Sequence, residues 1–379
     1  MIDALASDST LKFVSVAKSL AKEIKANLGL GEPDKYPPKG LVEELIRETK
    51  VKPTYTPSSG IRELREALAN WLNERYGTDV RPEEVMITPS GKAALYLAFL
   101  YMSKKVKSAL LFDPFYYSYP PVLKSLSIKI RSIPLEKGTV GYDFPKGIED
   151  LVAEKELVVL NTPSNPTGSV LGQKMYTLMK ALEEKDSYVI SDEVYDVFVY
   201  EGEHVSLIQT KGWRERGIMV YSFSKVLCVP GWRLGAIVAS EEVIKTLTTV
   251  ASNIYGCPCN WEQRAVAKFL SNHREELEEH IKSMVKEYSE RRDVVIGLLR
   301  EVGAFPGVGA GAFYAFPSFG VDSETLSLEA AKRGVIAIPG TIFSEVYGKD
   351  SVRISFSAPL EEVEYGIKVL GELAASIRG

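Results

Sequence analysis

The sequence predicts an α/β fold, in which helices cover both faces of a mainly parallel β-sheet. This prediction rests on four short, nearly continuous apolar runs at residues 109–113, 157–160, 188–191 and 218–221. Such runs are typical of strands buried on both faces, and segments of helical character separate them. The chain of 379 residues has room for one large and one smaller core, so two domains are expected.

The other elements are predicted from apolar periodicity and from Gly and Pro breakers. Before the first apolar run, helices are predicted at 11–27, 41–46 and 61–76, followed by an extended segment at 85–90 and a helix that begins at Gly91. Beyond the last run, the sequence predicts a charged helix at 273–301, strands around 334–339 and at 352–357, and a helix at 360–377. We therefore expect a large domain at 45–271 and a small domain formed by 1–44 with 272–379.

Composition excludes several classes of function. The net charge of −4 argues against a general nucleic-acid binder, and no apolar run reaches the roughly 20 residues that span a bilayer. The N-terminal residues 1–8 lack the apolar core of a secretion signal, so a cytoplasmic location is expected. Cys228, Cys257 and Cys259 form neither a disulfide framework nor a repeated metal-ligand spacing, so no metal site is predicted.

The segment 221–235 contains the strongest chemical signal in the chain. Lys225 is flanked by Ser222 and Ser224, and Arg233 follows after a Pro-Gly turn. Small hydroxyl side chains and an arginine can hold an anion through close approach and a two-donor fork. The lysine between them is either a second contact to that anion or a nucleophilic amine whose pKa is lowered by a nearby cation.

The other polar segments begin where predicted strands end. The segment 90–92 starts a helix, whose free N–H groups form an anion site. Asn165 lies in an N-P-T-G turn, and Asp192 follows the strand at 188–191. Arg353 stands between apolar neighbours on a strand and therefore needs an anionic partner. Ligands bind at the carboxyl ends of parallel strands, so we expect most of these groups to meet at one edge of the sheet.

These motifs resemble, in order and over nearly the whole chain, the class I/II pyridoxal-phosphate-dependent aminotransferases of fold type I. The matching segments are S-G-K at 90–92, N-P-T-G at 165–168, S-D-E-V-Y at 191–195, S-F-S-K at 222–225, G-W-R-L-G at 231–235 and V-R-I-S-F at 352–356. The resemblance implies a large domain with a mainly parallel seven-stranded sheet flanked by helices, plus a smaller α/β domain. It also implies a homodimer that acts on a small-molecule amino acid and 2-oxo acid, while charge and hydropathy predict neither a nucleic-acid nor a membrane partner.

The resemblance also assigns roles in binding pyridoxal 5'-phosphate. Lys225 would carry the cofactor as a Schiff base and move the proton on the substrate Cα. Asp192 would pair with the pyridine nitrogen, while Asn165 and Tyr195 would contact the phenolic oxygen and Tyr116 would cover the ring. The phosphate would be held by Ser90, Gly91, Lys92, Ser222, Ser224 and Arg233, with Tyr55 reaching it from the other subunit. Arg353 would bind the substrate α-carboxylate, with Gly31, Asn165 and Tyr116 beside it.

The substrate is predicted less directly. Lys92 lies where some members of the family place a lysine on the distal carboxylate of an acidic substrate, as in prokaryotic aspartate aminotransferases. This favours aspartate as donor and 2-oxoglutarate as acceptor, and Lys12 is a candidate for a second charge. Alternatively, Lys92 contacts only phosphate or turns outward. Aromatic or broad-range amino donors are an alternative, because Phe13, Tyr117 and Tyr119 are available to line an apolar pocket. A C–S lyase on the same scaffold is a further alternative.

Overall fold

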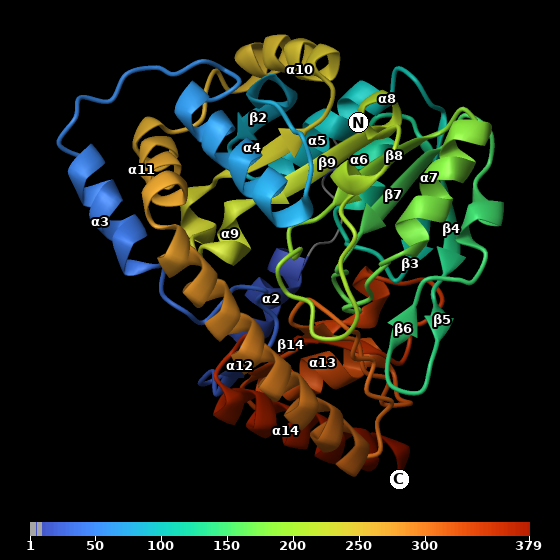
Figure 1. Cartoon of the computed structure of the whole chain (residues 1–379). Helices are drawn as coiled ribbons and strands as arrows, with labels where there is room; N and C mark the ends of the chain where they lie inside the picture. The colour runs from blue at the N-terminus through green and yellow to red at the C-terminus, as the bar shows by residue number, and fades with distance from the viewer. Residues whose placement is uncertain (1–4, 6–9) are drawn as a thin grey trace.

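The computed structural model describes residue 5 and residues 10–379 of the chain. Most of the segment 1–8, where no secretion signal is predicted, lies outside these residues. A seven-stranded sheet forms the centre of the larger part of the molecule (Figure 1). In spatial order it contains β2 (Val85–Thr88), β10 (Gly235–Val238), β9 (Gly217–Ser222), β8 (Tyr188–Asp192), β7 (Leu157–Asn161), β3 (Ser108–Asp113) and β4 (Lys129–Pro134).

Helices cover both faces of this sheet, as the apolar runs predict. On β9, Ile218 and Val220 belong to a core cluster shared with α5 (Gly91–Met102), α6 (Tyr119–Ser125) and α10 (Glu241–Ile254). The alternate residues Met219 and Tyr221 belong to a second cluster shared with α4 (Arg62–Tyr76) and α7 (Lys174–Glu184). Successive side chains of a strand point to opposite faces, so this strand is apolar throughout.

One strand of the sheet runs against the others. β10 pairs antiparallel with both β2 and β9, and its first residue, Gly235, lies opposite Thr88 and Ser222. The sequence prediction of a mainly parallel sheet is confirmed, although neither β10 nor β4 was predicted as a strand. Because β10 starts at the edge where its neighbours end, the residues that precede it arrive at that same edge.

The smaller part is built from the C-terminal third and the N-terminal arm (Figure 1). It contains the three-stranded sheet β11 (Tyr314–Ala315), β14 (Val352–Ser355) and β13 (Ile338–Pro339), with the helices α12 (Arg274–Glu301), α13 (Ser323–Lys332) and α14 (Leu360–Arg378). The predicted helices at 273–301 and 360–377 are therefore confirmed. Helix α2 (Thr10–Leu20) packs on α13.

The predicted helix at 11–27 is too long. Helix α2 ends at Leu20, and β1 (Ala26–Asn27) then pairs in parallel with β12 (Val335–Ile336). The backbone N–H groups of Lys25 and Ala26 donate to the carbonyl of Gly334, which requires an extended chain. The sequence-based helix included Ile24 because it fits the helical spacing, yet Ile24 is exposed. Tertiary pairing overrides the local pattern here.

Helix α3 (Lys39–Glu48) and helix α11 (Asn260–Asn272) lie against each other beside the large sheet. The predicted domain boundary between residues 44 and 45 falls inside α3. The division into 45–271 and 1–44 with 272–379 stays a prediction. No helix in the described part of the chain is long and apolar enough to cross a membrane.

Candidate active site

A cavity of about 310 Å³ lies between the carboxyl edge of the large sheet and the smaller part. It brings together most of the residues selected from the sequence: Gly31, Gly91, Lys92, Tyr116, Asn165, Asp192, Tyr195, Ser222, Ser224, Lys225, Arg233 and Arg353. Ser90 lies beside the cavity at the start of α5. Segments separated by more than three hundred positions in the chain therefore meet in one cavity.

The start of α5 forms one end of the cavity. The side chain of Ser90 caps the helix by accepting from the backbone N–H of Ala93, at 3.3 Å. Gly91 packs closely against Gly235, where an added Cβ would lie 2.5 Å from the Gly91 nitrogen. The backbone of β10 therefore passes directly beneath this turn. The free N–H groups at the start of a twelve-residue helix favour an anion at this position.

Hydroxyl groups and an arginine surround the same end. Ser222 ends β9, and its side chain accepts from the backbone N–H of Ser224 at 3.3 Å. Arg233 has a positive φ of 53°, and its guanidinium donates to the carbonyl of Pro230 at 2.7 Å. Its side chain is exposed on the protein surface at the cavity. This arrangement of hydroxyls, helix start and guanidinium suits a phosphate group.

Lys225 is half-buried next to this group, and its Nζ donates to the carbonyl oxygen of Gly31. Burial lowers the pKa of Lys225 to about 8, since the charged ammonium is poorly solvated there. The nearby charge of Glu32 opposes this shift, while Arg353 and Arg233 reinforce it. The uncharged amine, which a nucleophile or general base requires, is therefore far more accessible near neutral pH than in an ordinary lysine.

Asp192 ends β8 and is only 3% exposed. Its Oδ2 accepts from the hydroxyl of Tyr119 at 2.7 Å, whereas its Oδ1 has no hydrogen-bond partner among the described residues. Burial raises the pKa of Asp192 to about 7, and the hydrogen bond from Tyr119 opposes this rise only in part. A buried carboxylate oxygen without a partner is costly, so this group is suited to a cationic or N–H-bearing ligand.

Two asparagines join the strand ends to the substrate side of the cavity. The side-chain oxygen of Asn161 accepts from the backbone N–H of Asn165 at 2.6 Å, and its amide donates to the carbonyl of Asp192 at 3.1 Å. The side-chain oxygen of Asn165 then accepts from Arg353 at 3.4 Å. Asn161 has no predicted role in the sequence analysis, although its place at the end of a predicted strand was a usable signal.

Arg353 lies on β14 and is 4% exposed. One of its terminal nitrogens donates to the carbonyl of Gly29, while its Nε has no partner within the described parts of the chain. The rings of Tyr314 and Phe343 lie 5.0 and 5.1 Å from the guanidinium carbon. These contacts hold a buried guanidinium with donor capacity left over, which fits a carboxylate.

Tyr195 and Tyr314 share a buried hydrogen bond of 2.8 Å between their hydroxyl groups. A Cβ at Gly31 would overlap the hydroxyl of Tyr314, so only glycine fits there. Tyr314 has no predicted role in the sequence analysis, because no motif marks it.

Lys92 and the aromatic segment after β3 form the outer wall. The Lys92 Nζ donates to the hydroxyl of Tyr117 at 2.8 Å, and the rings of Tyr116 and Tyr117 meet edge to face at 4.8 Å. Burial alone would raise the pKa of Tyr117, but the bond from Lys92 is among the contacts that lower it to about 8. The ammonium of Lys92 therefore lies at the mouth of the cavity and does not turn away from it.

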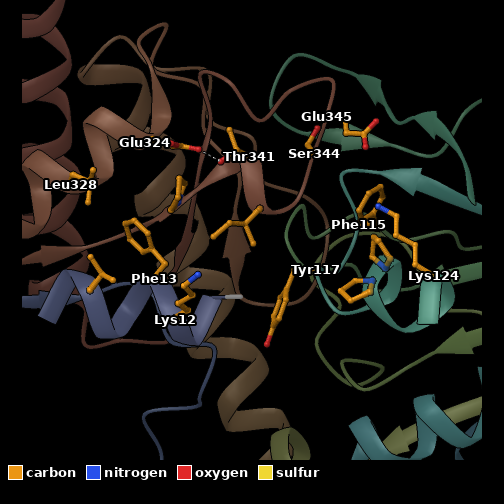
Figure 2. Close-up of a pocket in the computed structure, with 15 residues that line it drawn as sticks. Lys12, Phe13, Phe115, Tyr117, Lys124, Glu324, Leu328, Thr341, Ser344 and Glu345 are labelled. Carbon is orange, nitrogen blue, oxygen red and sulfur yellow. Dashed lines mark hydrogen bonds between the residues drawn. The ribbon is translucent and has the colours of Figure 1, made fainter. Parts of the chain in front are cut away.

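A second cavity, of about 810 Å³, adjoins the first, and Tyr117 lines both. Figure 2 shows Tyr117 between a wall with Lys12 and Phe13 of α2 and a wall with Phe115 and Lys124. The floor comes from α13 and from the 3-10 helix η5 (Gly340–Ile342). Lys12 thus lines this second cavity, which combines aromatic surface with charged groups.

Tyr55 stands apart from both cavities, with 97% of its surface exposed. Its loop is held by the start of α11. The Asn260 side chain donates to the carbonyl of Thr54 at 2.8 Å, and the fully buried Gln263 accepts from the backbone N–H of Ile61 at 2.9 Å. The structure therefore does not bring Tyr55 into the cavity of its own chain.

The side chains and backbone groups that line the cavity fit pyridoxal phosphate. The Lys225 amine can react with an aldehyde, the free oxygen of Asp192 can accept from a protonated ring nitrogen, and the α5 end of the cavity suits the phosphate. Arg353 leaves donors for a carboxylate at the other side.

Comparisons with known proteins agree with this chemistry. A family model for aminotransferase class I and II matches residues 23–370. The aspartate aminotransferase of Sulfolobus acidocaldarius is 35% identical, over 97% of this chain and 95% of its own length. Aromatic-amino-acid aminotransferase 2 of Thermococcus litoralis is 32% identical, over 89% of this chain and 88% of its own.

Among solved structures, the aspartate aminotransferase of Thermus thermophilus with maleate superimposes with a TM-score of 0.90 at 27% identity. The match covers 98% of both chains. The family model spans most of the sequence, and the fold, cavity and relatives all agree with the resemblance seen in the motifs. The chain belongs to the class I and II aminotransferases and is a pyridoxal-phosphate-dependent aminotransferase of fold type I.

Proposed function

We propose that this aminotransferase takes its amino group from aspartate and passes it to 2-oxoglutarate. The observation behind this proposal is the pair of cations in one cavity, the buried Arg353 and the ammonium of Lys92 at the mouth. Each dicarboxylic substrate has two carboxylates, and a cation for each would select them over neutral amino acids. The aspartate aminotransferases among the relatives support the same choice.

The residues divide the work of binding the cofactor. The start of α5, at Ser90, Gly91 and the backbone of Lys92, would hold the phosphate together with Ser222, Ser224 and Arg233. Lys225 would bind the cofactor covalently, and Tyr116 would lie over its ring. Asn165 and Tyr195 would contact the phenolic oxygen, while Asp192 would accept from the ring nitrogen. The bound cofactor supplies an electron-withdrawing ring that stabilises negative charge at the substrate Cα.

The protein groups then orient the substrate and move its proton. Arg353 binds the α-carboxylate, next to Asn165 and the backbone of Gly31, and so fixes the direction of the Cα–H bond. The amine of Lys225 would take the proton from the substrate Cα as a general base and give it back as a general acid. The lowering of the Lys225 pKa to about 8 brings both protonation states within reach near neutral pH.

A second candidate function is transamination of aromatic amino acids. The observation that favours it is the neighbouring cavity of about 810 Å³, which Phe13, Phe115 and Tyr117 line (Figure 2). An aromatic side chain that passes Tyr117 would lie against these rings. The aromatic-amino-acid aminotransferase of Thermococcus litoralis supports this alternative.

We further propose a homodimer in which Tyr55 reaches the phosphate in the partner's site. Tyr55 is 97% exposed, and its loop is held in place by hydrogen bonds with Asn260 and Gln263. Its side chain is therefore available for a contact with another chain. The cytoplasmic location stays a prediction from the sequence.

The raised pKa of Asp192 predicts a pH-dependent stability of the cofactor-free protein. Between about pH 4 and 7 the unfolded chain loses the Asp192 proton while the folded chain keeps it, so folding becomes less favourable as pH rises. The substitution Asp192→Asn removes this pH-dependent loss of stability. In urea unfolding between pH 5 and 7.5, the free energy of unfolding of the variant should rise relative to that of the wild type by up to about 1.4 kcal/mol per pH unit. This difference should become constant above about pH 7.

Asp322→Asn is the matched control, because Asp322 is an exposed cap of α13 whose pKa is lowered by its bonds to Thr325. Its difference from the wild type should stay constant over the same pH range. A constant difference for Asp192→Asn as well would contradict the assignment of a raised pKa.

The choice of substrate is tested with aspartate and phenylalanine as donors to 2-oxoglutarate. Lys92→Ala removes one charge-assisted contact of about 2 kcal/mol, so kcat/KM for aspartate should fall about 30-fold. The value for phenylalanine should change little. Lys124→Ala, in the second cavity, serves as a control for loss of a nearby charge. Equal losses on both donors would return Lys92 to a phosphate contact, and a wild-type preference for phenylalanine would favour the second candidate function.

The shared site is tested by co-expressing Tyr55→Ala and Lys225→Ala chains with different tags and isolating the mixed dimer. One of its two sites then contains both native residues, so activity should return to about half of the wild-type value per dimer. Each variant expressed alone should be strongly impaired. A mixed dimer as inactive as the Lys225→Ala homodimer would rule out the contribution of Tyr55 across the interface.

A further inference from the structure

Tyr314 connects two groups of the site that come from different parts of the molecule. It lies on β11, which pairs with β14, the strand that carries Arg353. Its side chain is 1% exposed, its ring lies 5.0 Å from the guanidinium carbon of Arg353, and its hydroxyl lies 2.8 Å from that of Tyr195. Tyr195 itself comes from the segment after β8 of the large sheet.

The position of the Tyr314 hydroxyl is tightly defined. A Cβ at Gly31 would overlap this hydroxyl, and the carbonyl of Gly31 accepts from Lys225. The rings of Phe313 and Tyr195 pack against the ring of Tyr314, with centre-to-centre distances of 5.1 and 5.5 Å. The hydroxyl therefore has little room to leave its bond with Tyr195.

The direction of this hydroxyl–hydroxyl bond decides what Tyr195 can do. A tyrosine hydroxyl has one proton to donate and can accept in return. If Tyr314 donates to Tyr195, the proton of Tyr195 is left free to point into the cavity. Accepting one bond also makes Tyr195 a stronger donor, since hydrogen bonds in a chain polarise one another. Burial raises the pKa of Tyr314, so its proton is retained near neutral pH.

We propose that Tyr314 is a positioning residue, whose hydroxyl directs the Tyr195 proton toward the phenolic oxygen of the cofactor and whose ring positions Arg353. The proposal rests on the roles proposed above for Tyr195 and Arg353. The two parts of the Tyr314 side chain would have different effects. The hydroxyl acts on the cofactor through Tyr195, and the ring acts on the substrate carboxylate through Arg353.

The test is a pH titration of the visible absorbance of the holoenzyme, which follows protonation of the lysine-bound cofactor without turnover. Tyr314→Phe keeps the ring and removes the hydroxyl, so Tyr195 stabilises the phenolic anion less. The midpoint of the titration should rise by about 0.5 pH unit, the size expected for one weakened hydrogen bond. The dissociation constant for maleate, an unreactive dicarboxylate, should stay within about twofold, because Arg353 keeps its ring contact.

Tyr314→Leu removes the ring as well and should weaken maleate binding about fivefold, as expected for loss of a buried cation–π contact of about 1 kcal/mol. The matched control is Tyr200→Phe, which removes a part-buried hydroxyl that donates to the carbonyl of Ala312 at 2.5 Å and not to Tyr195. This control should leave both the midpoint and the maleate constant unchanged.

An unchanged midpoint in Tyr314→Phe, or an equal shift in Tyr200→Phe, overturns the proposal. Tyr195→Phe separates this failure from failure of the proposed site. A shift in Tyr195→Phe without one in Tyr314→Phe contradicts the role of Tyr314 alone. No shift in Tyr195→Phe contradicts the role of Tyr195 at the phenolic oxygen and the inference built on it.

Discussion

The removal of charged groups from water at one edge of one sheet is the constraint on which the chemistry of this protein depends. The parallel strands end there together, and β10 starts there because it runs the opposite way. Burial at this edge lowers the pKa of Lys225 and raises that of Asp192, so an amine and a carboxyl are both brought toward neutral pH. The same burial leaves one oxygen of Asp192 without a hydrogen-bond partner among the described residues. A nitrogen of the cofactor would be that partner.

The smaller part completes the site by supplying what the sheet edge lacks. It places Arg353 against Asn165, and the chain segment with Gly29 and Gly31 joins the two parts through its carbonyl oxygens. Arg291 anchors that segment from α12, since it is 6% exposed and binds Asp34 at 2.7 Å. The smaller part thus contributes Arg353 to the substrate side of the cavity, where it meets Asn165 of the larger part.

The sequence allowed prediction of the α/β class and of the residues at the strand ends, because apolar runs and the polar residues after them are local signals. It did not predict β10, whose antiparallel direction depends on its pairing with β2 and β9. It assigned α2 seven residues too many, since pairing of β1 with β12 is a tertiary effect. Tyr119 and Tyr314 were missed as partners of Asp192 and Tyr195 because their importance comes from contacts, which no motif records. Tyr55, which the resemblance assigns to the phosphate of the other subunit, lies outside the cavity of its own chain.

The amine of Lys225 is the expected covalent anchor of the cofactor. Reduction of the holoenzyme with sodium borohydride makes a lysine-bound cofactor permanent, and peptide mass spectrometry then identifies the modified lysine. The cofactor adduct should appear on the peptide that contains Lys225, and none on the peptide that contains Lys92, the other lysine that lines the cavity. An adduct on Lys92, or a holoenzyme with no modified lysine, would contradict it.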